Sequence, residues 1–158
     1  MLAALAGGFV GTLVMVIITR AATEMGLTRM DLPFLLGTVV TEDRRRAKAV
    51  GYAFHLIMGL LFALVYWAFF AIIGRSSWWI GGLAGALQAL FISTVLVNEL
   101  LPVIHPRMAT FDTAANQFAL IEPPGFLMRN YGPQTPFASL AAHIAYGTVV
   151  GGFISLAG

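Results

Sequence analysis

Cysteine is absent from this chain and charged residues are scarce. Without cysteine the chain has no disulfide, thiolate metal site, iron–sulfur cluster or covalently attached haem. Charged residues make up 10% of the 158 residues and hydrophobic residues 59%, whereas about a quarter of the residues in a soluble domain are charged. The net charge of +2 is too small to indicate nucleic-acid binding. The composition therefore predicts an integral membrane protein, folded as a single domain over residues 1–158.

Long apolar runs predict an all-α fold. A helix needs about 20 apolar residues to cross the hydrocarbon core of a membrane. A tight turn at 74–77 and long loops at 24–46 and 105–135 separate the runs that reach this length. The first run has no basic segment before it and no small-residue cleavage site, so we interpret it as a retained helix. We expect a four-transmembrane-helix bundle with spans at residues 2–23, 47–73, 78–104 and 136–157.

The positions of Lys and Arg predict the orientation of the bundle. Of the nine basic residues, only Arg75 lies in the short turn. The others lie in or beside the two long loops: Arg20, Arg29, Arg44, Arg45, Arg46, Lys48, Arg107 and Arg129. Because basic residues collect on the cytoplasmic side of membrane proteins, we expect cytoplasmic loops, both termini outside, and a location in a bacterial inner membrane.

Two pairs of similar segments indicate an internal repeat. GGFVGTL at 7–13 matches GGLAGAL at 81–87, and AFHLIMG at 53–59 matches AAHIAYG at 141–147, which puts His55 and His143 in register. We interpret the chain as two copies of a helix–long loop–helix unit, related by an axis along the membrane normal. Small residues spaced by four allow helices to pack closely. This packing role, or alternatively contact with another subunit or a second copy, is expected for Gly7/Gly11, Gly81/Gly85 and Gly147/Gly151.

Polar residues lie at similar depth in the cytoplasmic half of every span. Ionisable groups inside a span are costly to insert and therefore suggest function. One interpretation is structural: each imidazole bonds within the bundle, and Glu99 pairs with Arg20 or Arg107. The other is a ligand site, in which we expect His55, Asn98, Glu99, His105 and His143 to cluster, with the i, i+4 pair Arg20 and Glu24 at the end of the first span.

Several ligands suit that cluster. His55, His143 and Glu99, with Asp31 or Glu122, could hold a metal ion, since imidazole and carboxylate together suit several transition metals and helix bundles build such sites. The Glu-x-x-His spacing typical of these sites is absent. The two histidines alone could ligate haem b, and a quinone or lipid headgroup could contact the same layer.

The long loops carry local signals. Residues 105–135 keep several aromatic residues and little charge, which predicts a packed cytoplasmic lid with a short helix near 113–120, capped by Asp112 or Thr110. Residues 31–40 are too short to span and predict an interfacial or re-entrant segment. Residues 41–43 predict an N-terminal cap for the second span.

No hydrolase, P-loop, zincin or dinucleotide motif is present. The first hypothesis is a small non-catalytic accessory subunit of a larger membrane complex, binding a cofactor, lipid or quinone. The alternative is a small dimeric transporter or channel, or a metal-dependent membrane enzyme, working through the His/Glu cluster. The outer half of the spans is nearly free of polar groups, which favours the first. The expected partners are membrane lipids and other membrane subunits or a second copy, not nucleic acid.

Overall fold

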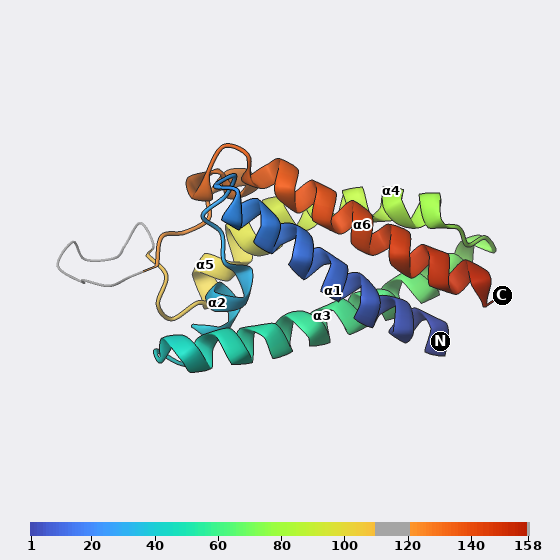
Figure 1. Cartoon of the computed structure of the whole chain (residues 1–158), viewed down its shortest axis with the longest axis horizontal. Helices are drawn as coiled ribbons and strands as arrows, with labels where there is room; N and C mark the ends of the chain where they lie inside the picture. Colours follow the sequence, from blue (N-terminus) through green and yellow to red (C-terminus); the bar gives the residue numbers. More distant parts are fainter. Residues whose placement is uncertain (110–120, 158) are drawn as a thin grey trace.

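The computed structural model describes residues 1–109 and 121–157 and is 78% helical, with no strand in that part of the chain. Four helical rods are long and apolar enough to cross a membrane, as predicted. They are α1 (Leu2–Glu24), α3 (Arg44–Ile73), the continuous rod α4 (Trp78–Phe91), η1 (Ile92–Leu100) and α5 (Leu101–Ile104), and α6 (Thr135–Leu156). Figure 1 shows both termini and the 74–77 turn at one end, here called the turn end. The described parts of the two long connections lie at the other, the loop end.

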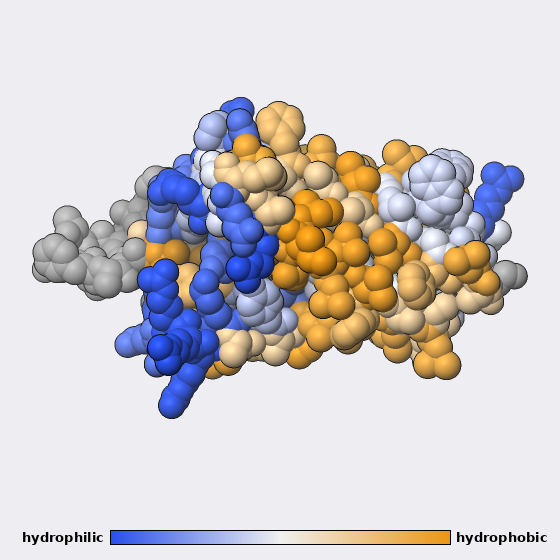
Figure 2. Space-filling model, viewed as in Figure 1, coloured by the Kyte–Doolittle hydropathy of each residue, from blue (hydrophilic) through white to orange (hydrophobic). Residues whose placement is uncertain are grey.

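The outer surface of the rods is apolar. Ile72 is 84% exposed and Leu87 is 69% exposed, and a broad hydrophobic band covers the middle of the molecule, with hydrophilic residues gathered at the loop end (Figure 2). Helices that are apolar on their outer faces need lipid or protein around them. The length and composition of the four rods thus mark a multi-pass membrane protein.

Short polar side chains set the ends of α3 and α4. The Asp43 carboxylate accepts a hydrogen bond from the Arg46 N–H at 2.8 Å, which confirms the predicted cap and starts α3 three residues earlier than expected. Gly74 ends α3 with a φ of 65°, a left-handed conformation that glycine adopts without strain. Ser77 then caps α4 by accepting from the Ile80 N–H at 3.3 Å. These residues make the hairpin tight.

The glycine faces pack inside the chain. A Cβ at Gly81 would collide with the carbonyl of Gly147, and one at Gly85 with the carbonyl of His143, so α4 and α6 approach at backbone distance. On α1, Gly7 meets Val150 and Phe153 of α6, Gly8 meets Ala63 of α3, and Gly11 meets Tyr146 of α6. Gly7, Gly11, Gly81, Gly85, Gly147 and Gly151 are all buried. The glycines therefore have the expected packing role inside the chain, and contact with another subunit stays a prediction.

The bundle is open on one side. α1 packs against both α3 and α6, and α6 packs against α4, whereas α3 and α4 hardly touch beyond the turn that joins them. Matching glycines make comparable contacts in the two halves: Gly59 of α3 faces α1 as Gly147 of α6 faces α4. The close α1–α6 contact has no counterpart between α4 and α3, so the internal repeat stays a prediction.

The third span is not a regular α-helix. Its segment η1 is a π-helix, in which each carbonyl bonds five residues ahead. Pro102 lacks the N–H that the Asn98 carbonyl would receive in an α-helix, and its ring crowds that turn. Nearer the turn end, the Ser93 and Thr94 hydroxyls donate to carbonyls four residues back, in competition with the backbone. The sequence analysis did not anticipate this widening.

A second core closes the loop end. Leu35 of α2 (Leu32–Gly37) packs with Val97, Leu101, Met108 and Met128. Met128 belongs to η2 (Phe126–Tyr131), and the segment before α6 therefore rests on η1. The expected helix at 113–120 and its caps Thr110 and Asp112 lie outside the described residues, and the lid stays a prediction.

Candidate ligand cavity between α3 and the third span

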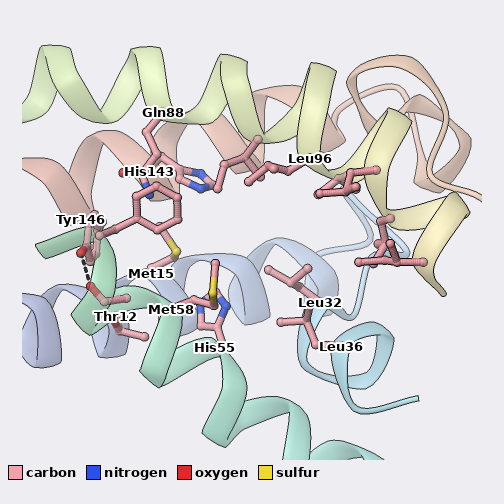
Figure 3. A pocket seen from close by; sticks show the side chains of 17 residues that line it. Thr12, Met15, Leu32, Leu36, His55, Met58, Gln88, Leu96, His143 and Tyr146 are labelled. Atoms are coloured by element: carbon pink, nitrogen blue, oxygen red, sulfur yellow. Dashed lines mark hydrogen bonds between the residues drawn. The ribbon is translucent and has the colours of Figure 1, made fainter. Parts of the chain in front are cut away.

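An apolar cavity of about 230 Å³ lies between α3 and the third span, where the two rods diverge. We call it the α3–α4 cavity. Met15 of α1 and Tyr146 of α6 form its floor, and Leu32 and Leu36 of α2 bound it at the loop end (Figure 3). No Asp, Glu, Lys or Arg is among its lining residues in the described part of the chain. Such a space suits an uncharged molecule.

The cavity reaches the outer surface of the bundle. Met58, Leu100 and Ile104 line it and are 41%, 46% and 56% exposed. Met58 belongs to α3, while Leu100 and Ile104 belong to η1 and α5, so the opening lies between the two diverging rods. Since the residues around this opening are apolar, it faces the environment that surrounds the spans.

His143 presents one ring nitrogen that can bind a ligand. Its Nδ1 lies 2.8 Å from the Ser139 carbonyl oxygen, which can only accept, so Nδ1 carries the proton. Nε2 is then an acceptor, and among the described residues it has no hydrogen-bond partner. The residue is 7% exposed and projects from α6 into the cavity (Figure 3). A ring fixed by a backbone carbonyl with its second nitrogen free is the arrangement found in metal-ligating histidines, and it leaves that nitrogen free to accept a hydrogen bond as well.

His55 lines the same cavity from α3. Within residues 1–109 and 121–157 its ring makes no side-chain hydrogen bond, so either nitrogen can serve a ligand. The two histidines that the sequence placed in register thus meet at one cavity from different helices. Met15 and Met58 project beside them, and flexible thioethers adapt to the shape of an occupant.

Two tyrosines hold the turn-end wall. The Tyr146 hydroxyl donates to the Gly59 carbonyl at 2.5 Å and so ties α6 to α3. The Tyr66 hydroxyl donates to Gln88 Oε1 at 2.9 Å, a polar link between α3 and α4. Gln88 lines the cavity, and its amide NH₂ could donate to an occupant.

The structure does not bring Asn98 and Glu99 to this cavity. Glu99 is exposed, and its carboxylate accepts a hydrogen bond from the neighbouring Asn98 amide. The residues that η1 contributes to the cavity are Ile92, Leu96, Val97 and Leu100. Because η1 is a π-helix, a face assigned from α-helical spacing is shifted along this segment.

His105 has a structural environment at the loop end. Its Nδ1 accepts from the Arg107 N–H at 3.1 Å, so Nε2 carries the proton and lies 3.1 Å from the Leu35 carbonyl oxygen and 3.2 Å from Thr38 Oγ1. Burial and the nearby Arg107 charge lower its pKa, although the bond to Leu35 acts in the opposite direction. A neutral His105 therefore joins α2 to the end of the third span.

The remaining candidates form ion pairs near the surface. Arg20 and Glu24 pair at 3.2 Å, as predicted from their spacing. Asp31 pairs with Lys48 at 2.9 Å and Glu122 with Arg29 at 3.6 Å, so neither carboxylate lies with the two histidines. Arg107, an alternative partner for Glu99, pairs with Glu42 at 3.3 Å.

The metal and haem hypotheses fit this geometry less well. No group of three or more His, Cys, Asp or Glu is gathered for a metal ion within the described residues. Haem ligation would use His55 and His143, but the 230 Å³ between them is below the roughly 300–1,000 Å³ typical of ligand pockets. A macrocycle would require α3 to move outward. A ring-sized group fits, since an engineered cavity of about 150 Å³ binds benzene.

Two smaller cavities continue from the histidines toward the loop end. The first, about 40 Å³, is lined by both histidines and by hydroxyls of Thr19, Thr28, Thr135 and Ser139, and we call it the hydroxyl cavity. The second, about 130 Å³, is lined by Arg20, Glu24, Asp31, Lys48 and Tyr52, and we call it the charged cavity. The threonines and Ser139 were not among the sequence candidates, because hydroxyls inside spans commonly bond their own helix.

Comparison with known proteins adds no relative: no family model, curated protein or solved structure matches this chain.

Proposed function

We propose that this protein is a non-catalytic membrane subunit that binds a neutral amphiphile of the bilayer, a quinone-like or lipid molecule, in the α3–α4 cavity. The observation that carries the proposal is an apolar cavity, open between the spans, with an uncommitted acceptor on His143 and a second imidazole on His55. Ligand sites of this kind combine an apolar wall with a few convergent polar groups.

The dimensions suggest how such a molecule would sit. The volume accommodates a ring or short headgroup but not a long chain as well. A chain attached to that group would leave through the opening beside Met58, Leu100 and Ile104, where it would meet lipid. His143, His55 and Gln88 would orient the buried polar group.

The orientation predicted from Lys and Arg belongs to this proposal. With the loop end cytoplasmic, the histidines would lie in the inner leaflet, and the basic residues of loops 24–46 and 105–135 would face anionic lipid headgroups. Residues 105–135 would then cover the cytoplasmic end as a lid. In this proposal the protein works beside a larger inner-membrane complex.

The test is to identify the molecules that co-purify with the protein. The chain is purified in lipid nanodiscs, and bound molecules are extracted and quantified by mass spectrometry against empty nanodiscs. Leu96→Trp fills the cavity, whereas Leu87→Trp adds the same bulk on an exposed site of α4. We expect the enriched molecule to fall by about tenfold in Leu96→Trp, which corresponds to roughly 1.4 kcal/mol of binding, and to stay at the wild-type level in Leu87→Trp.

His143→Ala and His55→Ala complete the test. Both are expected to reduce the same molecule while the helical content stays that of the wild type. An equal lipid and quinone profile in wild type, Leu96→Trp and empty nanodiscs would refute the proposed function.

A further inference from the structure

We infer that the amphiphile in the α3–α4 cavity carries an acidic ring hydroxyl, of the phenol or hydroquinone class. We also infer that the two histidines exchange its proton with water at the loop end through the hydroxyl cavity. This inference rests on the proposed function and specifies both the ligand class and the direction of proton movement.

The hydrogen-bond pattern of His143 selects a donor. Its Nδ1–H is held by the Ser139 carbonyl at 2.8 Å, so Nε2 of this cavity-lining residue is a lone-pair acceptor. An acceptor binds an O–H group and does not bind a ketone or ester carbonyl. A quinone in its oxidised form would leave this nitrogen unsatisfied, whereas a ring hydroxyl satisfies it.

The three cavities share lining residues and so lie in series. His55 and His143 line both the α3–α4 cavity and the hydroxyl cavity, so together with Met15 and Leu32 they form the wall between the two. Thr19, Met30 and Leu32 line both the hydroxyl cavity and the charged cavity. The imidazoles therefore stand between the α3–α4 cavity, into which Figure 3 looks, and two cavities lined by hydroxyl-bearing and then by charged residues. Figure 2 shows that hydrophilic residues gather at the loop end.

The hydroxyl cavity can hold water. Its volume of about 40 Å³ exceeds the roughly 10–15 Å³ that one water requires, provided that polar partners surround it. The hydroxyls that a water there would have to share are those of Thr28 and Thr135, which bond each other at 2.8 Å across the bundle, and Ser139 Oγ, which lies 3.4 Å from His143 Nδ1. No comparable set of hydroxyls lines the α3–α4 cavity, where Thr12 is committed to the Gly8 carbonyl.

The proton step balances without a redox partner. The ligand O–H bond breaks, an N–H bond forms at His143 Nε2, and the phenolate and imidazolium remain as a pair with no net charge. The Nδ1 proton then passes beside Ser139 to water in the hydroxyl cavity, and the reverse sequence reprotonates the ligand. Histidine suits this role because it binds and releases a proton near neutral pH and has two distinct nitrogens.

Few other titratable groups surround His143 and the ligand hydroxyl. His55 faces this pair from α3, and Tyr146 and Tyr66 lie on the turn-end side. Toward α1 and the α2–α3 segment, the charged cavity holds Arg20 paired with Glu24 and Lys48 paired with Asp31. These pairs balance in charge, so His143 and His55 are the groups positioned to exchange the proton.

The experiment uses the full chain in nanodiscs with 4-heptyl-7-hydroxycoumarin as the probe. Its excitation spectrum distinguishes the phenol from the phenolate, so binding and protonation are measured separately. After a pH jump in the outer solution, we expect the bound probe in the wild type to change protonation state, and the change to be at least about tenfold slower in His143→Ala.

Variants in the small cavity separate the route from the binding site. Ala138→Leu fills the hydroxyl cavity without reaching the α3–α4 cavity, and Ala141→Leu adds the same bulk at an exposed site of α6. Thr28→Val keeps the shape but removes a hydroxyl. Ala138→Leu and Thr28→Val should bind the probe with wild-type affinity and exchange its proton more slowly, whereas Ala141→Leu should match the wild type in both.

A failure of the proton-exchange inference can be distinguished from a failure of the proposed function. Probe that binds to the wild type but exchanges its proton at an unchanged rate in Ala138→Leu and His143→Ala overturns the inference and leaves the proposed function standing. A probe that binds wild-type nanodiscs no better than empty ones, together with no enriched molecule in the extraction, overturns both.

Discussion

Replacing Gly147 with Ala tests the backbone contact that holds α4 to α6. A Cβ at this position would collide with the Gly81 carbonyl and lie 2.9 Å from the Tyr66 hydroxyl. The backbone cannot rotate aside as a side chain can, so the helices must separate, and overpacking of this kind costs about 1–3 kcal/mol. Gly152 lies on the same helix, yet a Cβ there would meet only Trp78 Cβ at 3.9 Å, an ordinary contact.

Both substitutions gain the same helix propensity, about 1 kcal/mol in favour of Ala. We therefore expect Gly152→Ala to be neutral or to raise the free energy of unfolding by up to about 1 kcal/mol. The cost of the clash less the same gain predicts that Gly147→Ala lowers the free energy of unfolding by up to about 2 kcal/mol. The assay is reversible unfolding in mixed micelles, followed by circular dichroism. Free energies of unfolding that agree within about 0.5 kcal/mol between the two variants would fall within the usual spread of neutral substitutions. That result would contradict the close packing of α4 on α6.

Three further predictions concern the Tyr66 hydrogen bond, the pKa of His105 and the topology. Tyr66→Phe removes the bond to Gln88 and should lower stability by about 0.6 kcal/mol, the average for hydrogen bonds between membrane helices; an unchanged unfolding curve would remove this link between α3 and α4. Because the pKa of His105 is lowered in the folded protein, its unfolded form binds more protons, and stability should fall as the pH drops below about 6.5. His105→Gln should lack that component in acid unfolding titrations, and an identical pH dependence would contradict it. A reporter fused after Gly158 should be active outside the cytoplasm, and activity only in the cytoplasm would reverse the predicted topology.

The spans and their ends were accessible from sequence because they depend on local properties. Apolar length defined the four rods, and the cap at Asp43 follows from a short carboxylate before a helical run. The pair Arg20 and Glu24 follows from helical spacing. Each of these features involves residues within a few positions of one another.

The candidate site was predicted only in part because it depends on how helices face each other. His55 and His143 were identified by their register, and both line the α3–α4 cavity. Glu99 was placed with them by counting depth along a regular helix. Pro102 and the widened turns of η1 invalidate that count, since the direction of each side chain depends on the number of residues per turn.

The opening between α3 and the third span had no sequence signal. It arises because α3 packs on α1 and α2 while α4 packs on α6, and a hydrophobic pattern alone does not reveal which faces lack a neighbour. The hydroxyl cavity was missed for a similar reason: Thr28 and Thr135 are 107 positions apart and meet only in the folded chain.

The one-sided support of α3 has a thermodynamic consequence. An occupant of the cavity would touch α3 and the third span together, and so would add contact between two rods that the chain links mainly through the Tyr66–Gln88 hydrogen bond. Any molecule that binds the folded state alone raises its stability by mass action, by about 2.7 kcal/mol at a hundred times its dissociation constant. The melting temperature of this protein should therefore depend on the composition of the surrounding bilayer. Extraction into a detergent that removes the occupant should loosen α3 before the α1–α6–α4 group.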